Sequence, residues 1–228
     1  KPIAWKDPNL WGVKNLFELK NAQRVLVSGN VMENCWTDGQ DGTAVLITPR
    51  NQSGTAPWSI VTDVDFENNI VSNVGTFLSL LGEDNVHPSG QTQRIRIHNN
   101  LVTDITRDYN VGPSIFRAAT IDSPNLYVTI THNTLLQSDD ELALNAHFNF
   151  QSPTTNIDGF ICQNNIGVHG RFHPTWSRTA NSTHTHNVWI MFTNSDRYAF
   201  NKASFASQNP GDFMADPNMA SVGFEDYD

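Results

Sequence analysis

A short pattern that recurs along the chain constrains its fold more than any other feature. In each copy two apolar residues alternate with other, mostly polar residues, an asparagine follows, and the next residue is usually apolar again. The copies are VLVSGNV from Val25, VDFENNI from Val64, IRIHNNL from Ile95, VTITHNT from Val128 and FICQNNI from Phe160. A weaker sixth copy, STHTHNV, begins at Ser182.

The asparagines of the first five copies recur at intervals of 39, 31, 33 and 32 residues, and that of the weaker copy follows after 22. A near-constant period of this length indicates supersecondary units that stack on one another. We therefore expect each repeat to form one coil of a solenoid, with loops lengthening some of the coils.

The alternation within each copy predicts which side chains form the core. A strand with one face in water places every second side chain inside. The residues five and three positions before each asparagine are therefore expected to point inward. These residues are Val25 and Val27, Val64 and Phe66, Ile95 and Ile97, Val128 and Ile130, and Phe160 and Cys162.

The asparagine marks a corner of the coil, because an apolar segment resumes directly after it. A tight corner often needs a left-handed backbone, which asparagine tolerates better than most residues. Equivalent corners would stack about 4.8 Å apart, so each side-chain amide can donate to the next. The sequence therefore predicts a structural asparagine ladder made of Asn30, Asn69, Asn100, Asn133 and Asn165.

A second set of strand-like segments lies between the asparagines. They are TAVLIT from Thr43, TFLSLLG from Thr76, SIFRAAT from Ser114 and LALNAHF from Leu142. Helical periodicity is hard to find in these windows, and Gly, Pro, Asn and Asp occupy the gaps between them. A β-sandwich also has short strands, but it would not repeat one corner motif at a near-constant phase. The prediction is an all-β solenoid.

Composition restricts the partners of the chain. Its 228 residues suit one domain, which we expect to be a monomer. The net charge is -9 with only 14 Lys and Arg residues, so no nucleic-acid partner is expected. No apolar run approaches the roughly 20 residues that a membrane span needs. We therefore expect no membrane partner.

Several segments together resemble a known family. VKNLFELKNAQRVLVSGNVMENCW, FENNIVSNVG, IRIHNNLVTDI and ITHNTLLQS are similar to coils of right-handed parallel β-helix proteins of the pectate-lyase-like superfamily, in particular secreted bacterial members without an assigned function. The resemblance covers about residues 14–193. It implies a right-handed parallel β-helix of about six coils within a single domain, residues 1–228, with an irregular C-terminal extension at 194–228. It also implies that coils are missing at both ends and that the protein is secreted, periplasmic or on the cell surface.

Two series of loops leave the repeats, and long loops on a rigid scaffold often carry function. The second series contains PRNQSGTAPW from Pro49 and GEDNVHPSGQT from Gly82. The first series follows the asparagines and would form a groove in which aromatic, acidic and basic groups bind an extended polysaccharide. Its candidate substrate-binding residues are Trp36, Asp38, Asp41, Tyr109, Arg171 and Trp176. The alternative is that these side chains only pack the loops onto the body or face water.

The same loops supply candidate catalytic residues. Asp139-Asp140 and the segment GVHG at 167–170 partly resemble hydrolases of the superfamily, in which paired carboxylates act as acid and base. The match to those hydrolases is incomplete. Their Asn-Thr-Asp segment is absent, and RIRI at 94–97 precedes the aspartate pair instead of following the histidine. A lyase would instead use Arg107 or His169, together with the acidic loop residue Asp108, around a uronate. No cofactor is expected, apart from Ca²⁺ in the case of a lyase.

Histidines and cysteines complete the candidates. His169, His173, His184 and His186 could form a metal site, but an atypical end coil explains the inward phase of His184 better, so no metal is expected. His132 and His186 precede their asparagines and are interpreted as structural corner residues. Cys35 is expected at the start of a loop, whereas Cys162 points into the core, so Cys35 should be the more accessible of the two. The two cysteines lie about four coils apart, too far for a disulfide.

Two functions of different classes remain open. The first is a carbohydrate-binding or carbohydrate-active β-helix, related to polysaccharide lyases, glycoside hydrolases or epimerases. The second is a non-catalytic structural or adhesive solenoid whose loops only cover its faces. Carboxylates that converge near a cation or an aromatic ring would favour the first function, and dispersed charges would favour the second.

Overall fold

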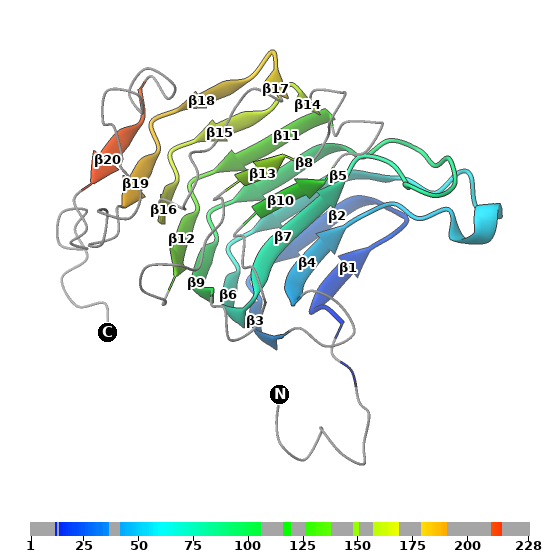
Figure 1. The fold of residues 1–228 in the computed structure, drawn as a ribbon, viewed down its shortest axis with the longest axis horizontal. Helices are drawn as coiled ribbons and strands as arrows, with labels where there is room; N and C mark the ends of the chain where they lie inside the picture. Colours follow the sequence, from blue (N-terminus) through cyan, green and yellow to red (C-terminus); the bar gives the residue numbers. More distant parts are fainter. Residues whose placement is uncertain are drawn as a thin grey trace.

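The computed structural model describes residues 12, 14–36, 42–105, 116–119, 126–137, 148–150, 157–168, 179–190 and 211–215. Within these ranges the chain is almost entirely β-structure, with one short 3₁₀ helix at Gln52–Gly54 (Figure 1). No helix among the described residues has the length and apolar character needed to cross a membrane.

The strands form three sheets, named here A, B and C, in which every pairing is parallel. Sheet A contains β1 (Phe17–Leu19), β4 (Thr43–Ile47), β7 (Thr76–Leu81), β10 (Phe116–Ala119) and β13 (Phe148–Phe150). Sheet B contains β2 (Ala22–Ser28), β5 (Val61–Glu67), β8 (Gln93–His98), β11 (Leu126–Thr131), β14 (Ile157–Asp158), β15 (Ile161–Gln163), β17 (Thr179–Ala180) and β18 (Thr183–Thr185). Sheet C contains β3 (Val31–Cys35), β6 (Ile70–Val74), β9 (Leu101–Ile105), β12 (Thr134–Gln137), β16 (Ile166–Val168), β19 (Val188–Ile190) and β20 (Phe213–Ala215).

The chain visits the three sheets in turn. It passes from β1 in sheet A to β2 in sheet B and β3 in sheet C, and then returns to sheet A at β4. Neighbours within a sheet are therefore one repeat apart, as Figure 1 shows for β2, β5, β8 and β11, whose colours run from blue to green along the stack. Such stacked parallel strands fit a parallel β-solenoid.

The strand register confirms the predicted alignment of the repeats. Val64 pairs with Val25 on one side and with Ile95 on the other, and Ile95 pairs in turn with Val128. Phe66 is likewise the register partner of Ile97. From Val64 onward the predicted inward residues are all at most 2% exposed. The sequence pattern therefore identified both the core positions and the pairing of the strands.

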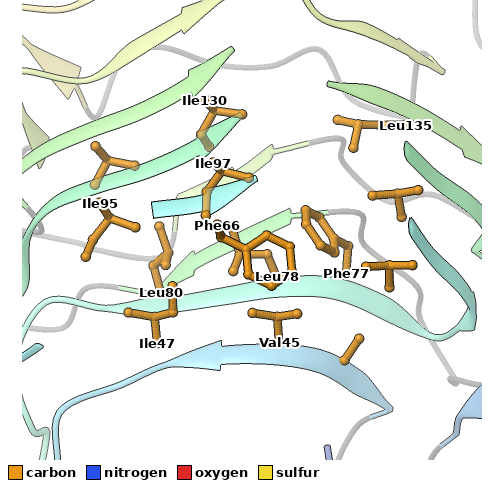
Figure 2. Close-up of a cluster of buried hydrophobic side chains, with 14 of the residues drawn as sticks. Val45, Ile47, Phe66, Phe77, Leu78, Leu80, Ile95, Ile97, Ile130 and Leu135 are labelled. Carbon is orange, nitrogen blue, oxygen red and sulfur yellow. The ribbon is translucent and has the colours of Figure 1, made fainter. Parts of the chain in front are cut away.

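The core lies between the sheets. Figure 2 shows Phe66 of sheet B beside Phe77 and Leu78 of sheet A. The ring centroids of Phe66 and Phe77 are 6.0 Å apart at an interplanar angle of 56°. Burying one side chain of this size contributes about 1.5 to 3 kcal/mol. The inward residues of the three sheets therefore supply the main stabilisation of the stack.

Hydrogen bonds join asparagines of successive repeats, which we call the asparagine row. The row consists of Asn30, Asn69, Asn100, Asn133, Asn165 and Asn187. The Nδ2 of each donates to the Oδ1 of the next at 2.9 to 3.1 Å. The same Oδ1 also accepts the backbone N–H of the preceding asparagine at 3.0 Å. Each amide of the row is thus held by two kinds of bond.

The left-handed backbone lies one residue earlier than the sequence analysis placed it. The residues with positive φ at this corner are Gly29, Asn68, Asn99, His132, Asn164, His186 and Gly211, with φ from 52° to 86°. The chain turns at this residue, which lets the following asparagine point inward to its hydrogen-bond partners. The structural interpretation of His132 and His186 as corner residues is therefore confirmed.

The row continues into the segment expected to be an irregular extension. Strand β20 lies within 194–228 and pairs with β19. Directly before it, Asp212 Oδ1 accepts bonds from the backbone N–H and Nδ2 of Asn187 at 2.9 and 3.0 Å. Its Oδ2 accepts the Trp189 Nε1–H at 2.9 Å. Asp212 therefore takes the place of an asparagine, and the indole donor explains why a second acceptor oxygen suits this position.

The prediction that Cys35 is the more accessible of the two cysteines is wrong, because both are 0% exposed. Cys35 is fully buried as the last residue of β3, and its Sγ donates to the Thr43 carbonyl oxygen at 3.4 Å. Burial raises the pKa of its thiol to about 11. The preceding Asn34 has a φ of 69°, which interrupts the alternation and turns Cys35 inward opposite Val74. Cys162 is buried as predicted, and both thiols are free.

Candidate functional site

Most of the predicted site residues lie outside the described residues. The predicted catalytic residues in this position are Asp139, Asp140, His169, Arg107 and Asp108. The predicted substrate-binding residues in this position are Asp38, Asp41, Tyr109, Arg171 and Trp176. Trp36 is described, and only 8% of it is exposed, so its ring offers little surface to a ligand. The loop groove remains a prediction.

The described chain does gather charged and aromatic side chains elsewhere, on the outer face of sheet B. There β5, β8 and β11 carry a shallow hollow of about 370 Å³. Its lining residues are Asp63, Asp65, Arg94, Ile95, Arg96, Tyr127 and Thr129. We call this hollow the sheet B site.

The backbone of the solenoid sets the spacing of this site. Asp63, Arg94 and Tyr127 occupy the same place in three successive repeats, each one residue before a buried core position. All three have a positive φ, between 53° and 56°, which is uncommon for residues other than glycine. Arg24 and Gly159 share this conformation in the adjacent repeats, so the bend belongs to the fold. The sequence then places an acid, a base and an aromatic ring at it.

Asp63 and Arg94 form a two-point ion pair. The Nε of Arg94 donates to Asp63 Oδ1 at 2.6 Å and its Nη2 donates to Oδ2 at 2.9 Å. The hydrogen bond from Arg94 lowers the pKa of Asp63 to about 2, and the same bond raises the pKa of Arg94. The Nη1 of Arg94 donates to Gln93 Oε1 at 2.6 Å. The guanidinium is thereby fixed in one orientation.

Arg96 forms the second pair of the site. Its Nε donates to Asp65 Oδ1 at 2.7 Å, and its Nη2 donates to Glu67 Oε2 at 3.1 Å. Asp65 and Arg96 are register partners on β5 and β8, so neighbouring strands bring their side chains together. The hydrogen bond that Arg96 donates to Asp65 raises the pKa of Arg96, which keeps the guanidinium charged.

Tyr127 supplies the aromatic surface of the site and is 54% exposed. A Cβ atom at Gly159, in the next repeat, would lie only 2.6 Å from Tyr127 Cδ1. The absence of a side chain at Gly159 therefore makes room for the tyrosine ring. Both residues have a positive φ, so the close approach follows from the shared bend of the two repeats.

Two loops of the second series are joined to each other by hydrogen bonds. One precedes β5 and the other precedes β8, which are two of the strands that form the sheet B site. The Nη1 of Arg50 in the first loop donates to Asp84 Oδ1 in the second at 3.0 Å. Burial raises the pKa of Asp84, but backbone N–H bonds from Val86 and Asn51 and the charge of Arg50 lower it further than burial raises it. The loops present Trp58, which is 70% exposed.

The described residues contain no group of three or more His, Cys, Asp or Glu side chains that could hold a metal ion. His184 is partly buried opposite Cys162, and burial lowers its pKa, whereas His186 is exposed at the corner. His169 and His173 fall outside the described ranges. The two described histidines therefore belong to an end repeat of the stack in this structure.

The chain matched no protein family, no curated protein and no solved structure. Its class therefore rests on the structure itself, which is an all-β protein with three stacked parallel sheets.

Asp65 and Arg96 belong to the alternating, mostly polar positions that the sequence analysis placed on the water-facing side of the strands. They did not stand out, because polar residues on an outer face are common. A usable signal was present, since residues of opposite charge occupy the same phase of the second and third repeats. Tyr127 was missed because it precedes the repeated pattern by one residue.

Proposed function

We propose that this protein is a right-handed parallel β-helix of about six coils, with the asparagine row as its ladder, that binds an extended polysaccharide. The alternation of the three sheets, the parallel register and the amide hydrogen bonds support the helix. The location that goes with this proposal is outside the cell, in the periplasm or on the cell surface, as in the proteins that the sequence resembles.

One observation carries the polysaccharide proposal: the exposed Tyr127 ring lies in one hollow with two carboxylate–guanidinium pairs. Sugar rings have apolar faces that can lie against an aromatic ring, and their hydroxyl groups need donors and acceptors at their edges. A small number of fixed polar groups beside an apolar surface is the usual composition of a ligand site.

An extended ligand suits the geometry of sheet B. Its strands stack about 4.8 Å apart, so the outer face repeats along the solenoid axis. Beyond the hollow, the face continues with polar side chains, and Gln163 Nε2 donates to Thr185 Oγ1 at 3.0 Å. A polymer lying along the axis would therefore meet hydrogen-bonding groups over several repeats.

The catalytic form of this proposal depends on the first loop series. In it, Asp139 and Asp140 are the acid and base of a hydrolase, or Arg107, Asp108 and His169 serve a lyase. The loops that carry Asp139, Asp140, Arg107 and Asp108 connect sheet C to sheet A, whereas His169 lies between β16 of sheet C and β17 of sheet B. None of these residues belongs to the strands that form the sheet B site. Binding at sheet B and cleavage in the loops are separate parts of the proposal and need separate tests.

A second candidate is a structural or adhesive solenoid without a sugar ligand. The observation that favours it is the mutual pairing of the charged groups, since Arg94 and Arg96 both have carboxylate partners on β5. Ion pairs of this kind also occur on surfaces that bind nothing. Their presence alone does not distinguish the two functions.

Affinity electrophoresis tests the proposal. The protein is run in native gels that contain neutral or acidic polysaccharides, beside the variants Tyr127→Ala and Phe213→Ala. Phe213 is a matched control because it is an aromatic residue that is 60% exposed on β20, away from sheet B. We expect at least one polysaccharide to retard the parent and Phe213→Ala but not Tyr127→Ala. Retardation of none of the proteins by any polymer would contradict the proposal and favour the second candidate.

Activity is measured on the same polysaccharides. New reducing ends would indicate hydrolysis, and ultraviolet absorbance from unsaturated products would indicate a lyase. Loss of activity in Asp139→Asn and Asp140→Asn, with Tyr127→Ala still active on short oligosaccharides, would support cleavage in the loops. Activity that survives both aspartate changes would contradict their catalytic role.

A further inference from the structure

The charges that line the sheet B site cancel one another. Asp63 and Asp65 contribute two carboxylates, and Arg94 and Arg96 contribute two guanidinium groups. The four groups also meet in pairs, with N···O distances of 2.6 Å in one and 2.7 Å in the other. The residues that line the hollow therefore carry no net formal charge. Beside them, Glu67 also pairs with Arg96 and the charge of Arg24 also acts on Asp63, which adds one charge of each sign.

We propose that the sheet B site selects uncharged polysaccharides over acidic ones, a proposal that rests on the proposed function. A uronate would need a cation whose charge is not already compensated. Here its carboxylate would instead approach Asp63 and Asp65, and like charges at such distances repel each other. The chain as a whole has a net charge of -9, which adds to the repulsion of a polyanion.

The protonation state of Asp63 supports this selection. Its pKa is lowered to about 2, mainly by the Arg94 hydrogen bond, so the carboxylate is ionised at every pH above the ordinary aspartate value. Neutralisation of Asp63 by a proton is therefore no route by which an acidic sugar could enter the site.

The paired groups keep hydrogen-bonding capacity for hydroxyl groups. A guanidinium has five N–H donors, and a carboxylate has about four acceptor positions. The bonds described for Arg96 use its Nε and one Nη atom, and each aspartate oxygen can accept more than one bond. Two neighbouring hydroxyl groups of a sugar can thus meet one donor and one acceptor at each pair, with the ring face against Tyr127.

Matched polymers provide the test. Binding is measured by isothermal titration calorimetry to neutral glucans and to polyuronates, with each polyuronate also supplied as its methyl ester, which has the same backbone without the charge. We expect the uncharged member of a pair to bind at least tenfold more tightly. Tyr127→Ala should weaken that binding roughly tenfold, the size of one aromatic contact. Equal or tighter binding of the charged member would overturn the proposal.

A change of selectivity provides the sharper test. The double variant Asp63→Asn/Asp65→Asn leaves two guanidinium charges in the hollow, so it should gain affinity for polyuronates. The double variant Glu33→Gln/Asp104→Asn is the matched control, since it removes the same number of negative charges from strands β3 and β9 of sheet C. Polyuronate binding that rises equally in both variants would attribute the effect to net charge and overturn the proposal.

The outcomes separate this inference from the proposed function. Preference for acidic polymers that is lost with Arg94→Gln/Arg96→Gln would overturn the selection but retain polysaccharide binding. Binding of no polymer would overturn both. Binding of neutral polymers that Tyr127→Ala does not alter would place the ligand elsewhere and overturn the inference. Binding of neutral polymers that depends on Tyr127 would support both.

Discussion

The asparagine row and the sheet B site are both rows of polar side chains at one phase of successive repeats, yet they differ in composition and burial. From Asn69 to Asn187 the row asparagines are at most 2% exposed, and one residue type fills every one of these positions. In the sheet B site the corresponding positions hold Asp63, Arg94 and Tyr127, which face solvent. In the buried row every amide bonds to the next repeat, so one residue type recurs. At the exposed positions no such bond fixes the residue type, so the same regular scaffold can carry the varied groups of the proposed ligand site.

The largest effect is expected in the asparagine row. Asn100→Ala should lower the free energy of unfolding by about 1 to 3 kcal/mol, because buried partners lose their bonds. The bonds at stake join the Nδ2 of Asn100 to Phe66 O and Asn133 Oδ1, and the Oδ1 of Asn100 to the Nδ2 of Asn69. Denaturant unfolding measures the loss.

Asn99→Gly is the control for this change. Asn99 is the exposed corner residue beside Asn100 and has a φ of 52°, which glycine adopts readily. We expect a much smaller loss of stability from it. Equal losses in the two variants would mean that the row contributes no more than the corner does.

The sheet B site should show the opposite behaviour, with a change in binding and little change in stability. Tyr127→Ala should lower the affinity for a bound polysaccharide roughly tenfold, while Tyr127→Phe should retain most of it because the ring remains. Calorimetric titration and thermal unfolding of the same samples measure the two effects. A large drop in unfolding temperature with Tyr127→Ala would indicate a structural residue and weaken the contrast between the two rows.

The end of the row predicts a pH dependence. Burial raises the pKa of Asp212 above its ordinary value, although bonds from Trp189 and Asn187 oppose the shift. A raised folded-state pKa means that the contribution of this group is fully present below about pH 3.9, the ordinary value, and is lost as the pH rises through the folded-state value. The free energy of unfolding of the parent, measured from pH 3 to 7, should therefore lose this contribution as the pH rises. The same pH-dependent loss in Asp212→Asn would contradict the assignment to Asp212.

The smallest effect is expected for the exposed pair of Asp63 and Arg94. The folded-state pKa of Asp63 is lowered to about 2. The contribution of the pair to stability is therefore present above the ordinary aspartate pKa and is lost only as the pH falls through about 2. The chemical shift of the Asp63 carboxyl carbon, followed by NMR, should therefore titrate near pH 2. A midpoint near pH 4 would mean that the ion pair does not persist in solution.

The core was predictable from the sequence because burial imposes a period. Val64, Ile95 and Val128 share one phase, and the predicted alignment agrees with their register. Cys35 was assigned wrongly because the left-handed Asn34 shifts the phase within one strand, which periodicity alone does not reveal. Asp212 was missed because an aspartate stands where the pattern has an asparagine.

The candidate site was less predictable, because a position that faces solvent can hold almost any polar residue. Asp65 and Arg96 alternate with core residues just as solvated side chains do, and only the register brings them together. The sequence analysis placed the site in the first loop series, around Trp36, Asp139 and Arg107, which is a different part of the coil from sheet B. The two locations make different predictions for a bound sugar.

The most direct test of the central claim is a crystal structure of the protein with a bound oligosaccharide, taken from a polymer that retards it in native gels. The account predicts a sugar ring against Tyr127, with hydroxyl oxygens within hydrogen-bond distance of the Asp63–Arg94 or Asp65–Arg96 pair. An oligosaccharide bound among the loops that carry Arg107, Asp139 and Asp140, with the sheet B site empty, would contradict it.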